Sequence, residues 1–176
     1  MLGINATQSH HGGPSVAQAA ASGNPLAFTL PKAKMAEPYD FSFSGLKTAV
    51  LRLAQAQIGE SYDFPSYKLA GRLSEAQKVD IAASFQSTAV ATIVDKALTA
   101  YREFSPRSIV IAGGVAANQE LRRQLTAALP LPVEYPDFKL CTDNGAMIAT
   151  LGCFMAASGQ AAADPSSLAI APNLSM

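Results

Sequence analysis

The run of residues 108–112, SIVIA, constrains the fold more than any other segment of this sequence. It is apolar and rich in β-branched side chains, without the alternation of a half-buried strand. Such a run is typical of a strand covered on both faces, as in a parallel sheet flanked by helices. Gly113 and Gly114 follow at once, and a helix is predicted from there to about Leu129, before Pro130.

Two further helices complete this pattern. Ser74 and Gln77 have the spacing of a capping box, and the helix that they begin is predicted to reach about Phe104. An apolar helix is predicted over 145–158, after a short strand at 133–135. Apolar side chains form one stripe on the first of these helices: Val79, Ala83, Val90, Val94, Ala97 and Tyr101. The order of elements predicts an α/β layered domain.

The N-terminal third has weaker signals. Residues 1–14 indicate a helix end followed by a polar loop, and the Ala-rich segment 15–22 predicts a short helix. Phe and Ser alternate over 40–44, which predicts a half-buried strand that Gly45 interrupts. A helix over 46–57 follows.

Composition sets the broad class. Hydrophobic residues make up 49% and charged residues 15%, so we expect one folded domain over 1–160 and a loose tail over 161–176. Lys and Arg number 13, as do Asp and Glu, which gives a net charge of zero. The chain therefore lacks the overall basic field of most nucleic-acid binders. If it binds RNA, a local basic patch or a partner must supply the positive charge.

Cys141 and Cys153 are the only cysteines and form no CxxC pair, which excludes a zinc knuckle. We interpret them as two buried, reduced thiols of a cytosolic protein. The chain opens without a signal-peptide pattern, and no apolar run is long enough to span a bilayer. These features predict a soluble, cytoplasmic protein without membrane contact.

The turn at Gly113 and Gly114 has two interpretations. Glycine lacks a Cβ, so a ligand can approach the backbone, and the N-terminus of the following helix suits a phosphate or a ribose. Asn118 is predicted in the first turn of that helix, where its amide can donate and accept. Spacing alone leaves both a nucleotide site and a tight structural turn open.

Asp143 and Asn144 precede the predicted apolar helix. Either residue suits an N-cap, and Asp143 also suits an oxygen ligand of a divalent metal. The spacing favours the cap, because one carboxylate does not make a metal site. Ser42 and Ser44 could present hydroxyls at a sheet end beside Lys47, although a solvated Lys47 fits the pattern equally well.

Four motifs occur in a fixed order: GGP at 12–14, FSFSGLKT at 41–48, GGVAAN at 113–118 and TDNGAMIA at 142–149. Together they resemble the TsaD family, also called Gcp, of tRNA N6-adenosine threonylcarbamoyltransferases. The resemblance implies an ASKHA fold (actin, sugar kinase, Hsp70), with two related lobes around a nucleotide cleft.

The resemblance also implies a reaction. A threonylcarbamoyl group passes from threonylcarbamoyl-AMP to N6 of the adenosine next to the tRNA anticodon. Gly13 and Asn118 match residues that contact the adenylate, beside the turn at Gly113 and Gly114. Asp143 matches a ligand of the metal, for which iron and zinc both suit. No position matches a catalytic side chain, and the implied partners are tRNA and TsaB-like and TsaE-like subunits.

The chain also departs from the family. The family's two metal-binding histidines, in an HxxxH helix, and its upstream phosphate loop have no counterpart here. We therefore expect mainly the C-terminal lobe, with the N-terminal lobe missing, and a chain that is inactive alone. One alternative is a non-catalytic half-lobe that binds a partner but neither adenylate nor metal. A second is a sugar kinase of the same fold, against which the SFSGLK stretch at 42–47 argues.

Overall fold

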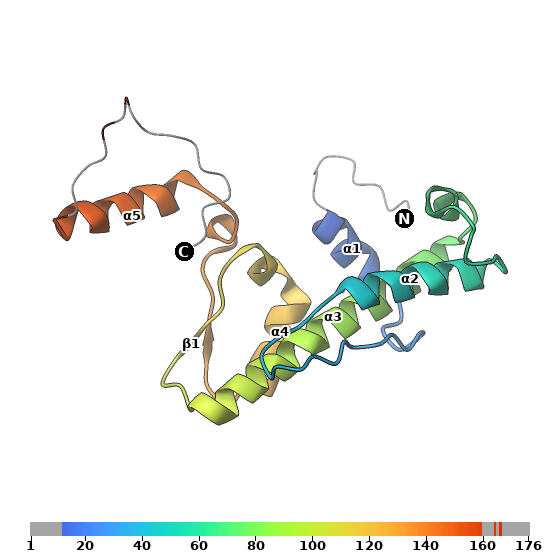
Figure 1. Cartoon of the computed structure of the whole chain (residues 1–176), viewed down its shortest axis with the longest axis horizontal. Helices are drawn as coiled ribbons and strands as arrows, with labels where there is room; N and C mark the ends of the chain where they lie inside the picture. The colour runs from blue at the N-terminus through green and yellow to red at the C-terminus, as the bar shows by residue number, and fades with distance from the viewer. Residues whose placement is uncertain (1–11, 160–163, 165, 167–176) are drawn as a thin grey trace.

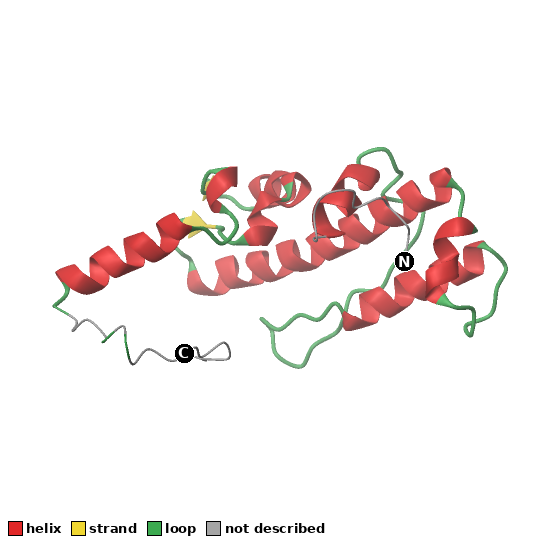
Figure 2. Cartoon of the chain, turned by 90° about the horizontal axis from the view of Figure 1, so that it is seen from above, coloured by secondary structure: helices red, strands yellow, loops and turns green. Residues whose placement is uncertain are grey.

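The long helix α3 (Glu75–Phe104) forms an axis along which three other helices lie (Figure 1). The computed structural model describes residues 12–159, 164 and 166. Helices α1 and α4 lie along one side of α3, and α2 runs on the opposite side (Figure 2). In chain order the elements are α1 (Gly12–Ala20), α2 (Ser44–Gln57), the 3₁₀ turn η1 (Ser66–Gly71), α3 (Glu75–Phe104), β1 (Ile109–Val110), η2 (Gly114–Ala117), α4 (Gln119–Ala128), β2 (Val133–Glu134), η3 (Phe138–Leu140) and α5 (Gly145–Ala157).

Helix α3 begins at the predicted capping box. The backbone N–H of Gln77 donates to Oγ of Ser74 at 3.2 Å, and the backbone N–H of Ser74 donates to Oε1 of Gln77 at 2.9 Å. These bonds satisfy backbone donors that a helix start leaves unpaired. The helix ends where Ser105 adopts a left-handed conformation with φ 43°. The predicted long helix is therefore confirmed at both ends.

Three apolar clusters hold the helices to α3. Leu69 of η1 is fully buried between α2 and the start of α3, and Leu125 of α4 is fully buried against the second half of α3. In the third cluster Ala20 of α1 packs on Ala82 and Ala83. These small side chains let α1 approach α3 closely. At Gly23, just beyond α1, a Cβ would overlap the backbone carbonyl of Val79.

The described strands form a two-stranded parallel sheet, with α4 as the crossover between them. Ile109 pairs with Val133, and Val110 pairs with Glu134. Ile109 and Val133 pack against the α3–α4 cluster, whereas Val110 is 62% exposed. The parallel pairing confirms the α/β prediction. The expectation of a strand covered on both faces is wrong for Val110, because no described element covers its outer face.

Two N-terminal predictions are wrong. Residues 41–43 are not a strand, and α2 begins at Ser44, where the backbone N–H donates to Oγ of Ser42 at 3.3 Å. This local bond favours a turn into the helix over extended chain. Residues 12–14, predicted as loop, form the first turn of α1 instead. Pro14 suits that turn because a helix start needs no donor there. Residues 1–11 lie outside the described part.

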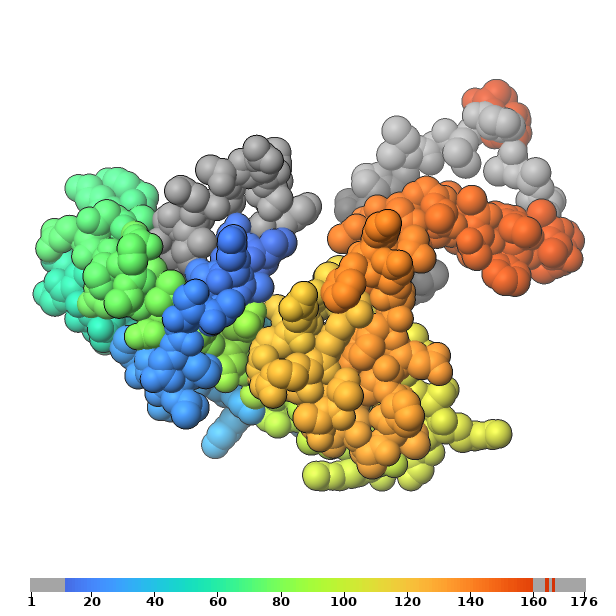
Figure 3. Space-filling view, turned by 180° about the vertical axis from the view of Figure 1, so that it is seen from behind, coloured from blue at the N-terminus to red at the C-terminus, as the bar shows by residue number. Residues whose placement is uncertain are grey.

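Helix α5 stands apart from the α3 core (Figures 1 and 3). The predicted helix is confirmed and is followed by Gly159 in a left-handed conformation, with φ 75°, yet every residue of α5 is exposed. Cys153, predicted as buried, is exposed for this reason, while Cys141 is buried as predicted. Among the described helices, none combines the length and apolar character that crossing a membrane requires. The predicted tail lies almost entirely outside the described residues.

Candidate functional site

The sheet leads into the predicted glycine turn. Gly113 has φ +88°, which side chains with a Cβ rarely adopt, so this position favours glycine for its backbone conformation. Gly114 begins η2. A Cβ on either glycine would meet no described atom within 4 Å, so the space beside both is open. The turn therefore leaves room for a ligand to approach the protein backbone closely.

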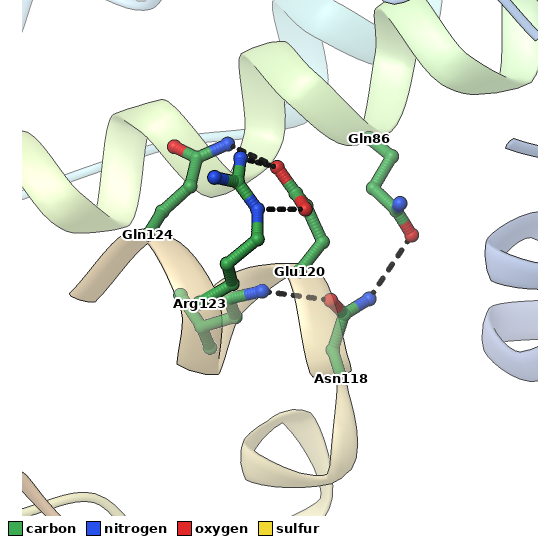
Figure 4. Close-up of polar contacts among 6 residues, drawn as sticks. Gln86, Asn118, Glu120, Arg123 and Gln124 are labelled. Carbon is green, nitrogen blue, oxygen red and sulfur yellow. Dashed lines mark hydrogen bonds and ion pairs between the residues drawn. The ribbon is translucent and has the colours of Figure 1, made fainter. Parts of the chain in front are cut away.

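Asn118 is the N-cap of α4. Its Oδ1 accepts from the backbone N–H of Leu121 at 3.0 Å, and its Nδ2 donates to Oε1 of Gln86 at 3.2 Å (Figure 4). The structure therefore places Asn118 at the N-cap, one residue before the first turn in which it was predicted. An amide has two N–H donors and two acceptor lone pairs, so one donor and one lone pair of Asn118 remain for a ligand.

The first turn of α4 carries a paired carboxylate. Glu120 accepts from Nε and Nη2 of Arg123 at 2.8 and 2.7 Å, and from Nε2 of Gln124 at 2.7 Å (Figure 4). The hydrogen bond from Arg123 lowers the pKa of Glu120, and the same contact raises the pKa of Arg123. Glu120 is therefore ionised and paired at neutral pH, which makes it a poor general acid or base.

Arg122 connects the glycine turn to the segment that carries Asp143. Its guanidinium donates from Nε to the carbonyl of Ala116, and from Nη2 to the carbonyl of Pro136 at 3.2 Å and to Sγ of Cys141 at 3.4 Å. It also lies 4.6 Å and 4.0 Å from the ring centroids of Tyr135 and Phe138, respectively. The planar guanidinium can stack on aromatic rings while it donates at its edge. Sequence reasoning assigned no such role to Arg122, because its partners are distributed over residues 116–141.

Asp143 is exposed and forms no hydrogen bond or ion pair with the described part of the chain. Its neighbour Asn144 is the N-cap of α5: Oδ1 accepts from the N–H of Met147 at 3.1 Å, and Nδ2 donates to the carbonyl of Thr142 at 2.8 Å. The cap predicted for this pair is therefore Asn144, which leaves the carboxylate of Asp143 accessible.

The described residues do not assemble a metal centre. No group of three His, Cys, Asp or Glu side chains lies close enough together to hold an ion within that part of the chain. Zinc sites use three or four protein ligands, and Asp143 is a single carboxylate. Gly13, the remaining predicted site residue, lies in the first turn of α1 and is exposed. The open hollow at η1, lined by residues 64–72, is not lined by any predicted site residue.

The described elements define an α/β protein in which a parallel strand leads through a glycine turn into a capped helix. The family profile of TsaD, described as tRNA N6-adenosine threonylcarbamoyltransferase, matches residues 2–150, and the chain belongs to this family. The resemblance drawn from the four motifs is thereby confirmed.

Curated relatives agree with this assignment, and each is named tRNA N6-adenosine threonylcarbamoyltransferase. The protein of Thermomicrobium roseum is 42% identical over 155 residues, which cover 84% of this chain and 42% of that protein. The protein of Symbiobacterium thermophilum is 42% identical over 84% of this chain and 40% of its own length. The protein of Trichodesmium erythraeum is 46% identical, over 81% and 43%. The chain thus spans about two fifths of these relatives.

Proposed function

We propose that this chain supplies the adenylate-holding part of an enzyme that transfers threonylcarbamoyl from threonylcarbamoyl-AMP to N6 of the adenosine next to the tRNA anticodon. The observation that carries the proposal is the family match over 2–150, which contains both the 113–118 turn and Asp143. The shared name of the relatives supports it. We assign the chain to one lobe of an ASKHA fold and to the cytoplasm as part of the same proposal.

In this proposal the turn holds the nucleotide. Gly113 and Gly114 leave open space in which the adenylate can approach the protein backbone. Asn118 has one free N–H donor and one free acceptor lone pair. Gly13 adds its backbone N–H at the start of α1, where the first donors of a helix lack internal partners. Holding the adenylate there fixes its carbamoyl carbon in the orientation that attack by the tRNA amine requires. N6 bonds to the carbamoyl carbon, the carbon–oxygen bond to phosphate breaks, and AMP leaves as N6 loses a proton.

We also propose a metal ion and partner subunits. Asp143 would provide one ligand of an iron or zinc ion, which when bound supplies Lewis-acid chemistry. Asp143 belongs to no group of three such ligands within the described residues. We therefore propose that the 176 residues alone are inactive. Activity would also involve TsaB-like and TsaE-like subunits.

Titration of threonylcarbamoyl-AMP into the chain tests the nucleotide site. Asn118→Asp is the informative variant, because Asp caps helices as well as Asn while replacing the amide donor by a negative charge. We expect at least about tenfold weaker binding, in proportion to a lost charge-assisted contact of roughly 1.4 kcal/mol, and a loss of about 1 kcal/mol in stability because the donor to Gln86 is also removed. Thr150→Glu, on the exposed helix α5, adds the same charge away from the turn and is the control for general charge effects. Equal binding by wild type and Asn118→Asp would contradict the proposal.

An assay for transfer of labelled threonylcarbamoyl to tRNA tests the proposal that the 176 residues alone are inactive. We expect none from the 176-residue chain, with or without TsaB-like and TsaE-like subunits. Transfer by the chain alone would show that this part is wrong.

One observation favours the second candidate, a non-catalytic module that binds a partner. Helix α5 exposes five large apolar side chains, and it buries none. The exposed set is Met147, Ile148, Leu151, Phe154 and Met155. Exposed apolar area of this kind marks an interaction site. A chain that binds neither adenylate nor metal, yet captures a partner through α5, would support the module.

A further inference from the structure

Aromatic and basic side chains gather where α2 ends and η1 begins. Figure 3 shows the segments that carry them together at one end of the molecule. We call this set the aromatic–basic surface, and it consists of Arg52, Tyr62, Phe64, Tyr67, Lys68 and Arg72. It is separate from the predicted adenylate residues, and the proposed function leaves it unexplained.

Each aromatic ring on this surface has a cation beside it. The guanidinium carbon of Arg52 lies 4.3 Å from the ring centroid of Tyr62. Lys68 Nζ and the guanidinium carbon of Arg72 lie 5.7 Å from the rings of Tyr67 and Phe64, respectively. Tyr62 is still 67% exposed and Tyr67 77% exposed. These rings therefore have large areas on which another flat group can stack.

The positive charge on this surface is only partly neutralised. Arg72 forms an exposed ion pair with Glu60 at 3.2 Å. Arg52 and Lys68 have no carboxylate within ion-pair distance in the described residues, and Asp63 is the remaining acid of the segment 52–72. Three cations against two carboxylates give a local excess of one in a chain that is neutral overall. This is the kind of local patch that RNA binding by a neutral chain requires.

An open hollow of about 430 Å³ lies within the surface. The hollow is shallow and open to solvent, so it leaves room for a base to lie against the Tyr67 ring but does not enclose a ligand. Gly71 contributes to the room, because a Cβ there would meet no described atom within 4 Å. The lining residues are Phe64, Tyr67, Lys68, Gly71 and Arg72.

We propose that the aromatic–basic surface binds tRNA, with an unpaired base stacked on Tyr67 and phosphates held by Arg52 and Lys68. This inference rests on the proposed function, in which tRNA is the substrate. Single-stranded RNA is recognised by aromatic stacking combined with cations along the backbone. An acidic protein would bind through the cations alone. The exposed tyrosine faces therefore favour RNA, because its bases can stack on them.

The aromatic–basic surface and Asn118 lie near different points along α3, at a separation that one tRNA can span. Glu75, at the start of α3, follows η1 closely, and Gln86, eleven residues further on, bonds to Asn118. At about 1.5 Å per residue these positions are roughly 16 Å apart along the helix. About five nucleotides at roughly 3.4 Å each cover that distance. One tRNA can therefore contact the surface while its modified adenosine lies near Asn118.

Binding of a fluorescein-labelled tRNA transcript to the 176-residue chain, followed by anisotropy, tests the inference. We expect Tyr67→Ala to weaken binding about tenfold, within the range for loss of one stacked base. Lys68→Gln should reduce the slope of log K against log salt by about 0.7 to 0.9, the value for one phosphate contact. Phe104→Ala with Arg107→Gln is the matched control, because it removes an exposed ring and a cation at the far end of α3. It should bind like wild type.

Three results would overturn the inference. One is no binding of tRNA by the wild-type chain, and another is an equal loss in the control and in Tyr67→Ala. The third is a combined result: polyglutamate at equal charge displaces tRNA, and Tyr67→Ala leaves tRNA binding unchanged. This result would indicate a site for acidic proteins. Titration of threonylcarbamoyl-AMP in parallel separates the two proposals. If tRNA binding fails while adenylate binding depends on Asn118, only the present inference is wrong.

Discussion

Nδ2 of Asn118 donates to Oε1 of Gln86 at 3.2 Å, which joins the start of α4 to the middle of α3 across 32 residues of sequence (Figure 4). The same side chain caps α4 through the N–H of Leu121. The glycine turn before Asn118 is therefore held against α3 by a polar contact as well as by the apolar cluster below α4.

The two roles of Asn118 are separable by substitution. Asn118→Ala loses both the cap and the bond to Gln86, so we expect a loss of about 2 kcal/mol in the free energy of unfolding. Asn118→Ser keeps the cap and should lose only about 1 kcal/mol. Urea denaturation measures both, and a cycle with Gln86→Ala isolates the coupling between the pair. Equal losses for Ala and Ser would mean that the cap contributes nothing.

Arg122→Lys tests the connection between the glycine turn and the Asp143 segment. Lysine keeps the charge but cannot donate to the carbonyls of Ala116 and Pro136 together or stack in the same way on Phe138. We expect a loss of about 2 kcal/mol, from hydrogen bonds of a charged group and cation–π contacts. Arg123→Lys, whose partner Glu120 is on the same exposed helix face, should change stability by less than about 0.5 kcal/mol. Similar losses in both variants would contradict the assigned role of Arg122.

Local signals account for the parts of the fold that sequence predicted well. The capping box of Ser74 and Gln77 and the left-handed glycine after α5 involve residues only a few positions apart, so their geometry follows from nearby sequence. The family match required no geometry at all, because it rests on motifs in register. Pro14 was an available signal for a helix start, and it was outweighed by the two glycines before it.

Sequence reasoning missed one local feature, the turn at Ser42 and Ser44, and two features that depend on distant residues. Five alternating residues at 40–44 are too few to outweigh one hydrogen bond from Ser44 to Ser42. The contacts of Arg122 join three separate segments, which periodicity cannot detect. The general preference of free cysteine for burial predicted a buried Cys153, but that preference does not say which element would cover the side chain. The assigned roles of Asn118 and Asp143 toward ligands remain predictions.

The Glu120–Arg123 pair makes a pH-dependent contribution to stability. The folded pKa of Glu120 lies below its ordinary value of 4.5, so the contribution is present above that value and is lost as pH falls through the folded pKa. Arg123 is exposed, so solvent screens the pair and we expect its contribution at pH 7 to be small. Glu120→Gln should therefore destabilise the chain at pH 7, and this effect should disappear once the pH falls below the folded pKa of Glu120. Added salt should shrink the difference at pH 7, and a constant difference at all pH values would contradict the assignment.

The two cysteines should react at different rates with a thiol reagent such as DTNB. Cys153 is exposed on α5, whereas Cys141 is 2% exposed and lies under Arg122. We expect one thiol to react at once and the second only on unfolding, since reaction requires access. Cys153→Ser should abolish the fast phase. Two fast thiols in the wild-type chain would show that the Cys141 segment opens in solution.

The apolar surface of α5 should make the chain associate through this helix. Phe154 is 70% exposed and Leu151 57%, on a helix with no buried side chain. Exposed apolar area of this extent favours association, and a charge within it opposes burial. We expect Phe154→Glu to lower both the mass measured by light scattering and the fluorescence of bound ANS. Thr150→Glu adds the same charge on α5 without removing a large apolar side chain, and it should have a smaller effect. A wild-type chain that is monomeric and binds no ANS would show that α5 is covered in solution by residues of the same chain.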